Sequence, residues 1–112
     1  MYPNPFAPIS TGADAGTFNV QPLVISGTTT AQSGTLPGAG GSAYSDIRVE
    51  NHASDWAYVN FGDSTVAGAT SSSIGFAPGS VEIMHVPPNT TTVSVVLGSG
   101  TGQVTFSRGL GV

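Results

Sequence analysis

Few side chains of this sequence can support acid–base chemistry. The chain has six acids and two histidines, and general acid–base catalysis needs a pair of such groups held in a concave apolar pocket. His52 falls in a predicted turn, and His85 falls near the end of a predicted strand before Pro87. Neither histidine has a known catalytic spacing around it, and no serine has a base at triad spacing. The sequence therefore predicts no catalytic residue and no enzymatic activity.

A metal site is the second chemistry to consider, because acids and a histidine gather between positions 46 and 63. They are Asp46, Glu50, His52, Asp55 and Asp63. Asp46 and Glu50 fall on the same face of a predicted strand with Arg48 between them, which is typical of a solvent-facing charge ladder. The segment has neither an Asp-rich calcium loop nor a His-x-x-x-His spacing. We therefore predict neither a metal nor any other cofactor.

Two short motifs are better explained as turns. The run Gly98–Gly102 resembles a phosphate loop but lacks its lysine and following helix, so a hairpin turn is expected. Asn89-Thr90-Thr91 matches a glycosylation sequon, but this motif too is expected to form a turn. The segment MYPNPFAPIS lacks the pattern of a secretory signal, and the longest aliphatic stretch, Val93–Leu97, is too short to span a bilayer. We therefore expect synthesis in the cytoplasm, no glycan and no membrane contact.

Charge is unusually scarce in this chain. Charged residues are 7% of the total, whereas about 25% is usual for soluble domains. With Arg48 and Arg108 as the basic residues and a net charge of -4, the chain lacks the clustered cations that nucleic acid binding requires. Lysine normally protects exposed sheet edges and is depleted at protein interfaces. The absence of lysine therefore predicts that neighbouring subunits cover the sheet edges.

The elements that must position these residues are β-strands, because Thr, Val, Ser and Gly replace the usual helix formers. The 112 residues suit one domain, which we expect over residues 17–112, with residues 1–16 as an extended N-terminal arm. We predict an all-β, antiparallel, jelly-roll-like sandwich of seven or eight short strands. The predicted strands are Phe18–Ser26, Thr28–Ser33, Tyr44–Glu50, Trp56–Phe61, Ile74–Phe76, Val81–Val86, Thr91–Leu97 and Gln103–Arg108. Residues 34–43 are predicted to form a loop.

The clearest pattern predicts a hairpin between residues 44 and 61. Alternation places Ile47, Val49, Ala57, Val59 and Phe61 on one buried face. Trp56, Tyr58 and Asn60 then point the other way. Large aromatic groups outside the core are candidates for a contact surface.

The proline-rich arm is the second candidate contact. Its large side chains are Tyr2, Phe6 and Ile9, which are costly to leave in water, so the arm is expected to dock on a partner or on its own domain. The predicted intermolecular contacts are therefore Tyr2, Phe6, Ile9, Trp56 and Tyr58.

Two segments resemble a known family. They are DIRVENHASDWAYVNFGDS (Asp46 to Ser64) and FAPGSVEIMHVPPNTTTVSVVLGSGTGQVTFSRGLGV (Phe76 to Val112), and they are similar to small capsid decoration, or cement, proteins of tailed bacteriophages. The resemblance implies a jelly-roll-like sandwich, commonly trimeric, that binds the major capsid protein on the exterior of the virion. Repeated weak contacts over a shell would stabilise it through avidity.

Two other functions remain open at the level of sequence. The chain suits another virion component, such as a head-fibre base or a tail protein. It also suits a carbohydrate-binding sandwich in which Trp56, Tyr58 and Asp55 form a stacking platform.

Overall fold

The computed structural model describes residues 6–8, 22–37, 46–87 and 89–111, with backbone alone for residues 6–8, 110 and 111. Within these ranges the chain forms no helix. Eight strands and a three-residue strand, β1, make two antiparallel sheets. The prediction of an all-β antiparallel sandwich is confirmed.

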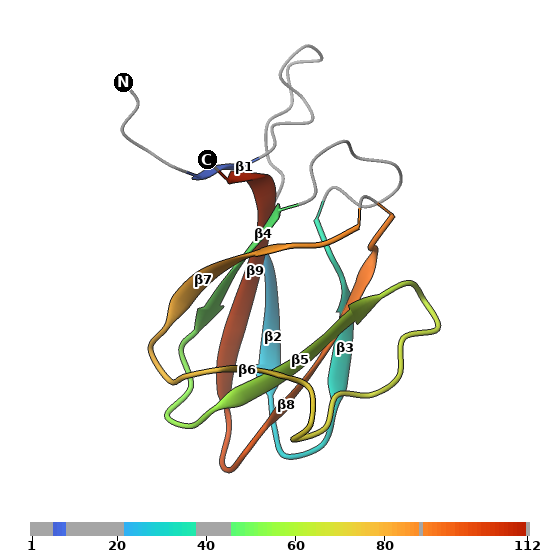
Figure 1. Ribbon diagram of the computed structural model, residues 1–112. Helices are drawn as coiled ribbons and strands as arrows, with labels where there is room; N and C mark the ends of the chain where they lie inside the picture. The colour runs from blue at the N-terminus through green and yellow to red at the C-terminus, as the bar shows by residue number, and fades with distance from the viewer. Residues whose placement is uncertain (1–5, 9–21, 38–45, 88, 112) are drawn as a thin grey trace.

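The first sheet is organised around the long C-terminal strand. Strand β9 pairs with β4 on one side, and β7 pairs with the far side of β4 (Figure 1). On its other side, β9 pairs with β2 along its first half and with β1 at its end. The strands are β1 (Phe6–Pro8), β2 (Leu23–Gly27), β4 (Asp46–Asn51), β7 (Val81–His85) and β9 (Gly102–Gly111).

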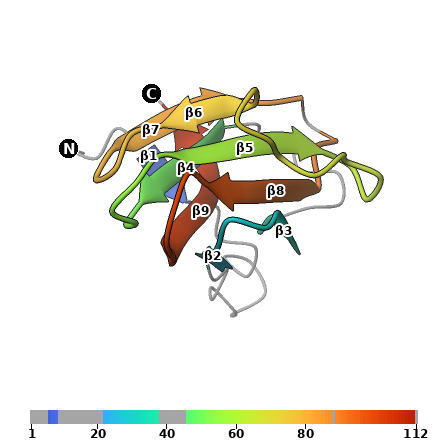
Figure 2. The same ribbon diagram turned by 90° about the horizontal axis from the view of Figure 1, so that it is seen from below.

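The second sheet has the strand order β3, β8, β5 and β6. Figure 2 shows these strands succeeding one another as a single layer from the lower to the upper part of the view. Their bounds are β3 (Gln32–Thr35), β5 (Ala57–Gly62), β6 (Ile74–Phe76) and β8 (Thr92–Leu97).

The core lies between the two sheets and follows the predicted alternation. Branched and aromatic side chains at every second position point inward, where they suit a pleated, half-buried surface. Phe106 of β9 meets Phe61 of β5 edge to face, with ring centroids 6.2 Å apart. The fully buried apolar residues include Ile47, Val49, Val59, Val93, Val95, Val104 and Phe106.

The predicted hairpin of residues 44–61 is wrong in its pairing, although its faces are right. β4 belongs to the first sheet and β5 to the second, so Val49 and Val59 enter the core from different sheets and are not ladder partners. Their connection crosses between the sheets, and the His52 amide donates to the Gln103 carbonyl, 2.9 Å away. Gly102 permits this crossing, because a Cβ there would lie 2.6 Å from the Ala53 Cα.

The predicted hairpin turn at Gly98–Gly102 is wrong for the same reason. It joins β8 of the second sheet to β9 of the first, and these strands do not pair with each other. Gly100 has a φ of 68° in this connection, a conformation that glycine adopts without steric cost. The glycines therefore mark a change of sheet.

Several strand boundaries also differ from the prediction, and β9 continues past Arg108 to Gly111. Thr28 caps a turn, in which its Oγ1 accepts a hydrogen bond from the Thr30 amide at 3.0 Å, so the polar strand begins at Gln32 instead. Leu36, placed in the predicted loop, is only 2% exposed. Its amide donates to the Thr91 carbonyl at 2.8 Å, which draws the end of β3 into the core. Residues 17–21 and 38–45 lie outside the described residues.

Part of the predicted N-terminal arm pairs with its own chain. β1 runs antiparallel to the end of β9, with Phe6 opposite Gly111 and Pro8 opposite Gly109. For these three residues the structure favours the alternative that the arm packs on its own domain. The rest of the arm, residues 1–5 and 9–16 with Tyr2 and Ile9, lies outside the described residues.

One end of the sandwich is closed around Arg108, which is only 1% exposed. Its Nε donates to the Pro37 carbonyl at 2.8 Å, and its terminal nitrogen donates to the buried Thr90 carbonyl. These carbonyls belong to the segment after β3 and to the connection between β7 and β8. Burial lowers the pKa of the guanidinium, which still stays protonated because an arginine does not lose its proton in proteins.

The opposite end is closed around Asn51, which is also 1% exposed. Its Nδ2 lies 3.0 Å from the Asp55 carbonyl, 3.0 Å from the Phe76 carbonyl and 3.2 Å from the Ala77 carbonyl. Its Oδ1 accepts a hydrogen bond from the Ala53 amide at 2.9 Å. One carboxamide therefore connects the β4–β5 crossing to the end of β6.

Candidate functional site

Of the five predicted contact residues, two have described side chains. Trp56 lies just before β5 and Tyr58 lies within it. Their neighbours Ala57 and Val59 are fully buried, so the alternation of the strand puts both aromatic side chains on the outer face of the second sheet. Trp56 is 46% exposed, and Tyr58 is partly buried.

The two aromatic rings are brought together over a glycine. A Cβ at Gly75 of β6 would lie 3.1 Å from Trp56 Cε3 and 3.4 Å from Tyr58 Cε1. Gly75 is the register partner of Tyr58, so the missing side chain lets both rings lie against the β6 backbone. We call Trp56 and Tyr58 the aromatic pair.

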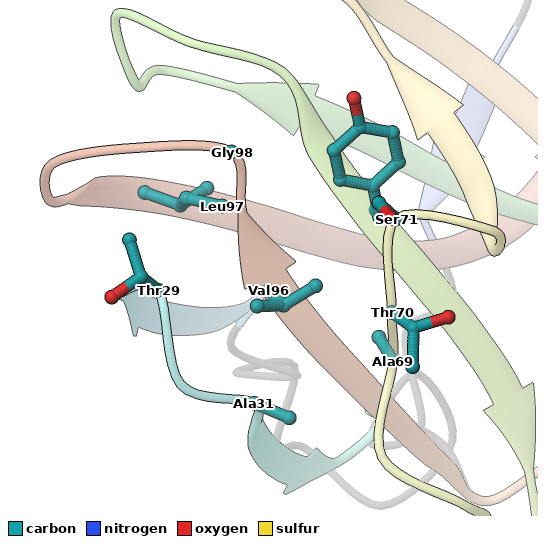
Figure 3. A pocket seen from close by; sticks show the side chains of 9 residues that line it. Thr29, Ala31, Ala69, Thr70, Ser71, Val96, Leu97 and Gly98 are labelled. Atoms are coloured by element: carbon teal, nitrogen blue, oxygen red, sulfur yellow. The ribbon is translucent and has the colours of Figure 1, made fainter.

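A hollow of about 370 Å³ lies beside this pair on the same face. Tyr58 and Val96 contribute to it from β5 and β8, and Thr29 and Ala31 from the connection between β2 and β3. Residues 69–71 form part of its lining from the β5–β6 connection. Figure 3 shows Val96 between the segment with Thr29 and Ala31 and the loop with Ala69, Thr70 and Ser71.

The loop that lines the hollow is held in place by hydrogen bonds to the sheet. Asn60 Nδ2 donates to the Ala67 carbonyl at 3.2 Å, and the Ala69 amide donates to the buried Ser94 hydroxyl at 2.9 Å. The loop also bonds within itself, since the Ser72 amide lies 3.2 Å from Thr70 Oγ1. The loop therefore covers one end of the outer face of the second sheet and leaves the aromatic pair uncovered.

Sequence reasoning did not find the polar residues of this hollow. Thr29, Thr70 and Ser71 come from two separate connections, and threonine and serine are common throughout the chain. No local pattern marks them, because only the tertiary structure brings the two connections to one face. Tyr58 was the single lining residue that the alternation singled out.

The outer face of the first sheet carries the predicted charge ladder. Arg48 Nε lies 3.1 Å from Glu50 Oε2, and His52 Nε2 lies 3.2 Å from Glu50 Oε1. At the end of the strand, His85 Nδ1 lies 2.9 Å from Asp46 Oδ1. The contact of Arg48 with Glu50 is an ion pair at the surface, worth at most about 1 kcal/mol. Each histidine contact is an ion pair only when its imidazole is protonated.

The remaining acids of the segment hydrogen-bond within their own turns or to a neighbouring one. Asp55 Oδ2 accepts from the Ser99 hydroxyl at 2.7 Å, and Oδ1 accepts from the Trp56 amide at 2.7 Å. Asp63 accepts from the amide of Thr65 at 2.8 Å. Among the described residues, no three acids, histidines or cysteines are grouped so that they could hold a metal ion.

The Asp55 carboxylate leads to a prediction about pH. The hydrogen bond from Ser99 is the main reason that the pKa of Asp55 lies below its ordinary value of 3.8, and the Trp56 amide adds to it. We expect Ser99→Ala to raise the pKa of Asp55, as followed by carbon NMR of the carboxyl group. The pKa of Asp63, which Thr65 lowers, serves as the internal control and should not change.

The hydrogen bond from Ser99 to Asp55 also stabilises the folded state in a way that depends on pH. A carboxyl group with a lowered pKa in the folded state stabilises the fold above its unfolded pKa, and loses that effect as pH falls through the folded value. Ser99→Ala should therefore make the free energy of unfolding less dependent on pH below 3.8, which is the ordinary pKa of the carboxyl group. An unchanged Asp55 titration would contradict the assigned role of Ser99.

Exposed aliphatic side chains mark the edges of the sheets. Val81 and Ile83 of β7 are 53% and 43% exposed, and Ile74 of β6 is 46% exposed. β7 is an edge of the first sheet, β6 is an edge of the second, and residues 77–80 join them. We call Ile74, Val81 and Ile83 the β6–β7 edge. At the other side of the first sheet, Val24 of β2 is 49% exposed.

The described part of the chain contains no helix with the length and apolar character needed to cross a membrane.

Comparison with protein families, with characterised proteins and with solved structures found no match to this chain.

Proposed function

We propose that this chain is a structural protein of a tailed-phage virion that binds the exterior of the capsid and stabilises the shell. The observation that carries the proposal is the β6–β7 edge, where aliphatic side chains of two consecutive strands, each at the edge of its own sheet, are exposed to solvent. Exposed strand edges are usually protected by lysine, proline or charge; this chain has no lysine, and β7 has a single acidic residue, Glu82, between Val81 and Ile83. An edge of this kind suits a protein that packs against other subunits.

The resemblance of Asp46 to Ser64 and of Phe76 to Val112 to decoration proteins points to the same function. A decoration protein needs many weak contacts and no reactive groups, and the outer charges of the described residues are largely engaged in surface pairs. The partners are then the major capsid protein and further copies of the chain, with a trimer as the expected assembly.

The test is binding to undecorated capsids of the phage that encodes the chain, measured by sedimentation. We expect saturable binding and a higher temperature of capsid rupture. The double variant Val81→Asp, Ile83→Asp should weaken binding by about tenfold or more, because it places charge at the apolar contact. Val24→Asp is the matched control, since Val24 has a similar exposure, 49%, and lies in β2 at the opposite edge of the first sheet.

Three results would contradict the proposal. They are the absence of binding to the capsid, equal binding by the double variant and the control, and an image reconstruction that places the chain at a fibre base or in the tail. Native mass spectrometry of the purified chain tests the expected trimer separately.

A further inference from the structure

The hollow beside the aromatic pair has a chemically simple lining. None of its lining residues carries a charge at neutral pH, so a phosphate or carboxylate group would find no counter-ion within it. The side-chain hydroxyls come from Thr29, Tyr58, Thr70 and Ser71. Val96 lies between the two segments that carry Thr29 and Thr70 (Figure 3), and Ala31 and Ala69 complete the apolar part of the lining.

This lining matches one class of ligand. A sugar ring carries hydroxyl groups around its rim and apolar C–H groups on its faces, so it can bond to hydroxyls while it packs on aliphatic and aromatic carbon. An apolar ligand would cover the hydroxyls of Thr29, Tyr58 and Ser71 without bonding to them, which is costly once water is excluded. The volume of about 370 Å³ is within the range of ligand pockets, about 300–1,000 Å³.

The aromatic pair extends the site beyond the hollow. Tyr58 lines the hollow and also contacts the Gly75 position, where Trp56 lies alongside it. Trp56 is 46% exposed, so its ring is accessible to a second sugar unit. Asp55, which the sequence assigned to a stacking platform, is bonded to Ser99 and is not one of the lining residues.

We propose that the hollow and the aromatic pair bind an uncharged oligosaccharide, with one sugar unit between Thr29 and Ser71 and the next on Trp56. The site lies on the outer face of the second sheet, whereas Val81 and Ile83, the residues that test the capsid contact, belong to β7 of the first sheet. Because the hollow is open and has no charged group, we expect weak binding, with a Kd of about 1 mM.

The experiment is an NMR titration of the nitrogen-labelled chain with maltotriose, cellotriose and triacetylchitotriose, each to about 20 mM, well above the expected Kd. We expect at least one of them to cause saturable shifts of Tyr58, Thr70 and Val96. Ser71→Trp, which fills the hollow, should weaken this binding by about tenfold or more. Ser64→Trp is the control, because Ser64 is exposed in the same connection but does not line the hollow.

The amide spectra of both variants show first whether each is folded, since both substitutions are at exposed positions. Trp56→Ala should weaken the trisaccharide and leave the corresponding monosaccharide unaffected. The proposal is overturned if none of the three probes gives saturable shifts, if Ser71→Trp binds as well as Ser64→Trp, or if the shifts map to the first sheet.

Discussion

Replacement of Arg108 by methionine is expected to lower the free energy of unfolding by about 3 kcal/mol. Methionine fills much of the same volume, but it cannot donate to the Pro37 and Thr90 carbonyls that the guanidinium now holds. A buried carbonyl without a donor costs about 1–3 kcal/mol. Relief of the desolvation of the guanidinium offsets only part of this loss, because the acceptors are backbone groups that remain in place.

The measurement is urea unfolding followed by tryptophan fluorescence, analysed by linear extrapolation. Arg48→Met is the matched control, because Arg48 is paired with Glu50 at the surface, where such pairs contribute about 0–1 kcal/mol. Arg108→Lys should give a loss between these two, since one ammonium group cannot reproduce the planar fork of arginine. Equal stability of Arg108→Met and Arg48→Met would show that the two carbonyls find other donors.

Replacement of Asn51 by alanine is expected to cost a similar amount, about 3 kcal/mol. The change removes the donor to the Asp55, Phe76 and Ala77 carbonyls and the acceptor for the Ala53 amide. Asn60→Ala is the control, because its amide also donates to loop carbonyls, of Ala67 and Gly68, but at a more exposed position. We expect the control to lose about 1 kcal/mol or less.

The variant Asn51→Asp separates hydrogen bonding from side-chain volume. Its ionised carboxylate would point an acceptor at carbonyl oxygens, so the pKa of the introduced group should lie above its ordinary value. A raised pKa means that the folded state favours the protonated form, so the stability of this variant should increase as pH falls through that pKa toward the lower pKa of the unfolded state. If Asn51→Ala were as stable as Asn60→Ala, the carboxamide would not be what joins the two connections.

The two substitutions should act on different ends of the sandwich. Arg108 lies opposite Ile47 in the ladder of β4 and β9, whereas Asn51 lies opposite Val104. The carbonyls held by Arg108 belong to the connections after β3 and β7, and those held by Asn51 belong to the connections after β4 and β6. Because the hydrogen bonds described for the two side chains reach different segments, we expect their effects on stability to be nearly additive.

Alternation along the chain was sufficient to predict the inward and outward faces of the main strands. Val49, Val59, Val104 and Phe106 are buried as expected, and the charge ladder of β4 faces outward. These predictions succeed because side chains in a strand alternate with a period of two whatever the partner strand is. The pair Pro78-Gly79 is typical of a turn, and the structure has a turn there: Gly79 has a φ of 77°, and the Ser80 amide donates to the Ala77 carbonyl at 3.1 Å.

Strand pairing was not predictable in the same way. A turn that makes a hairpin and a turn that crosses to the other sheet can have the same composition, as the connections 52–56 and 98–101 illustrate. What distinguishes them are contacts distant in sequence, such as those of Asn51 with Phe76 and of Ala53 with Gly102. Arg108 is a similar case, because nothing in its local sequence separates a buried arginine from an exposed one.

By itself, the sequence determined the all-β class, the faces of the strands and the outward position of Trp56 and Tyr58, because these depend on residue type and on a short local period. Only the tertiary structure decided which strands pair, which polar side chains are buried at the two ends, and that Thr29 and Ser71 line the same hollow as Tyr58. Those outcomes depend on how distant segments share hydrogen bonds and space, and no local pattern encodes such distances.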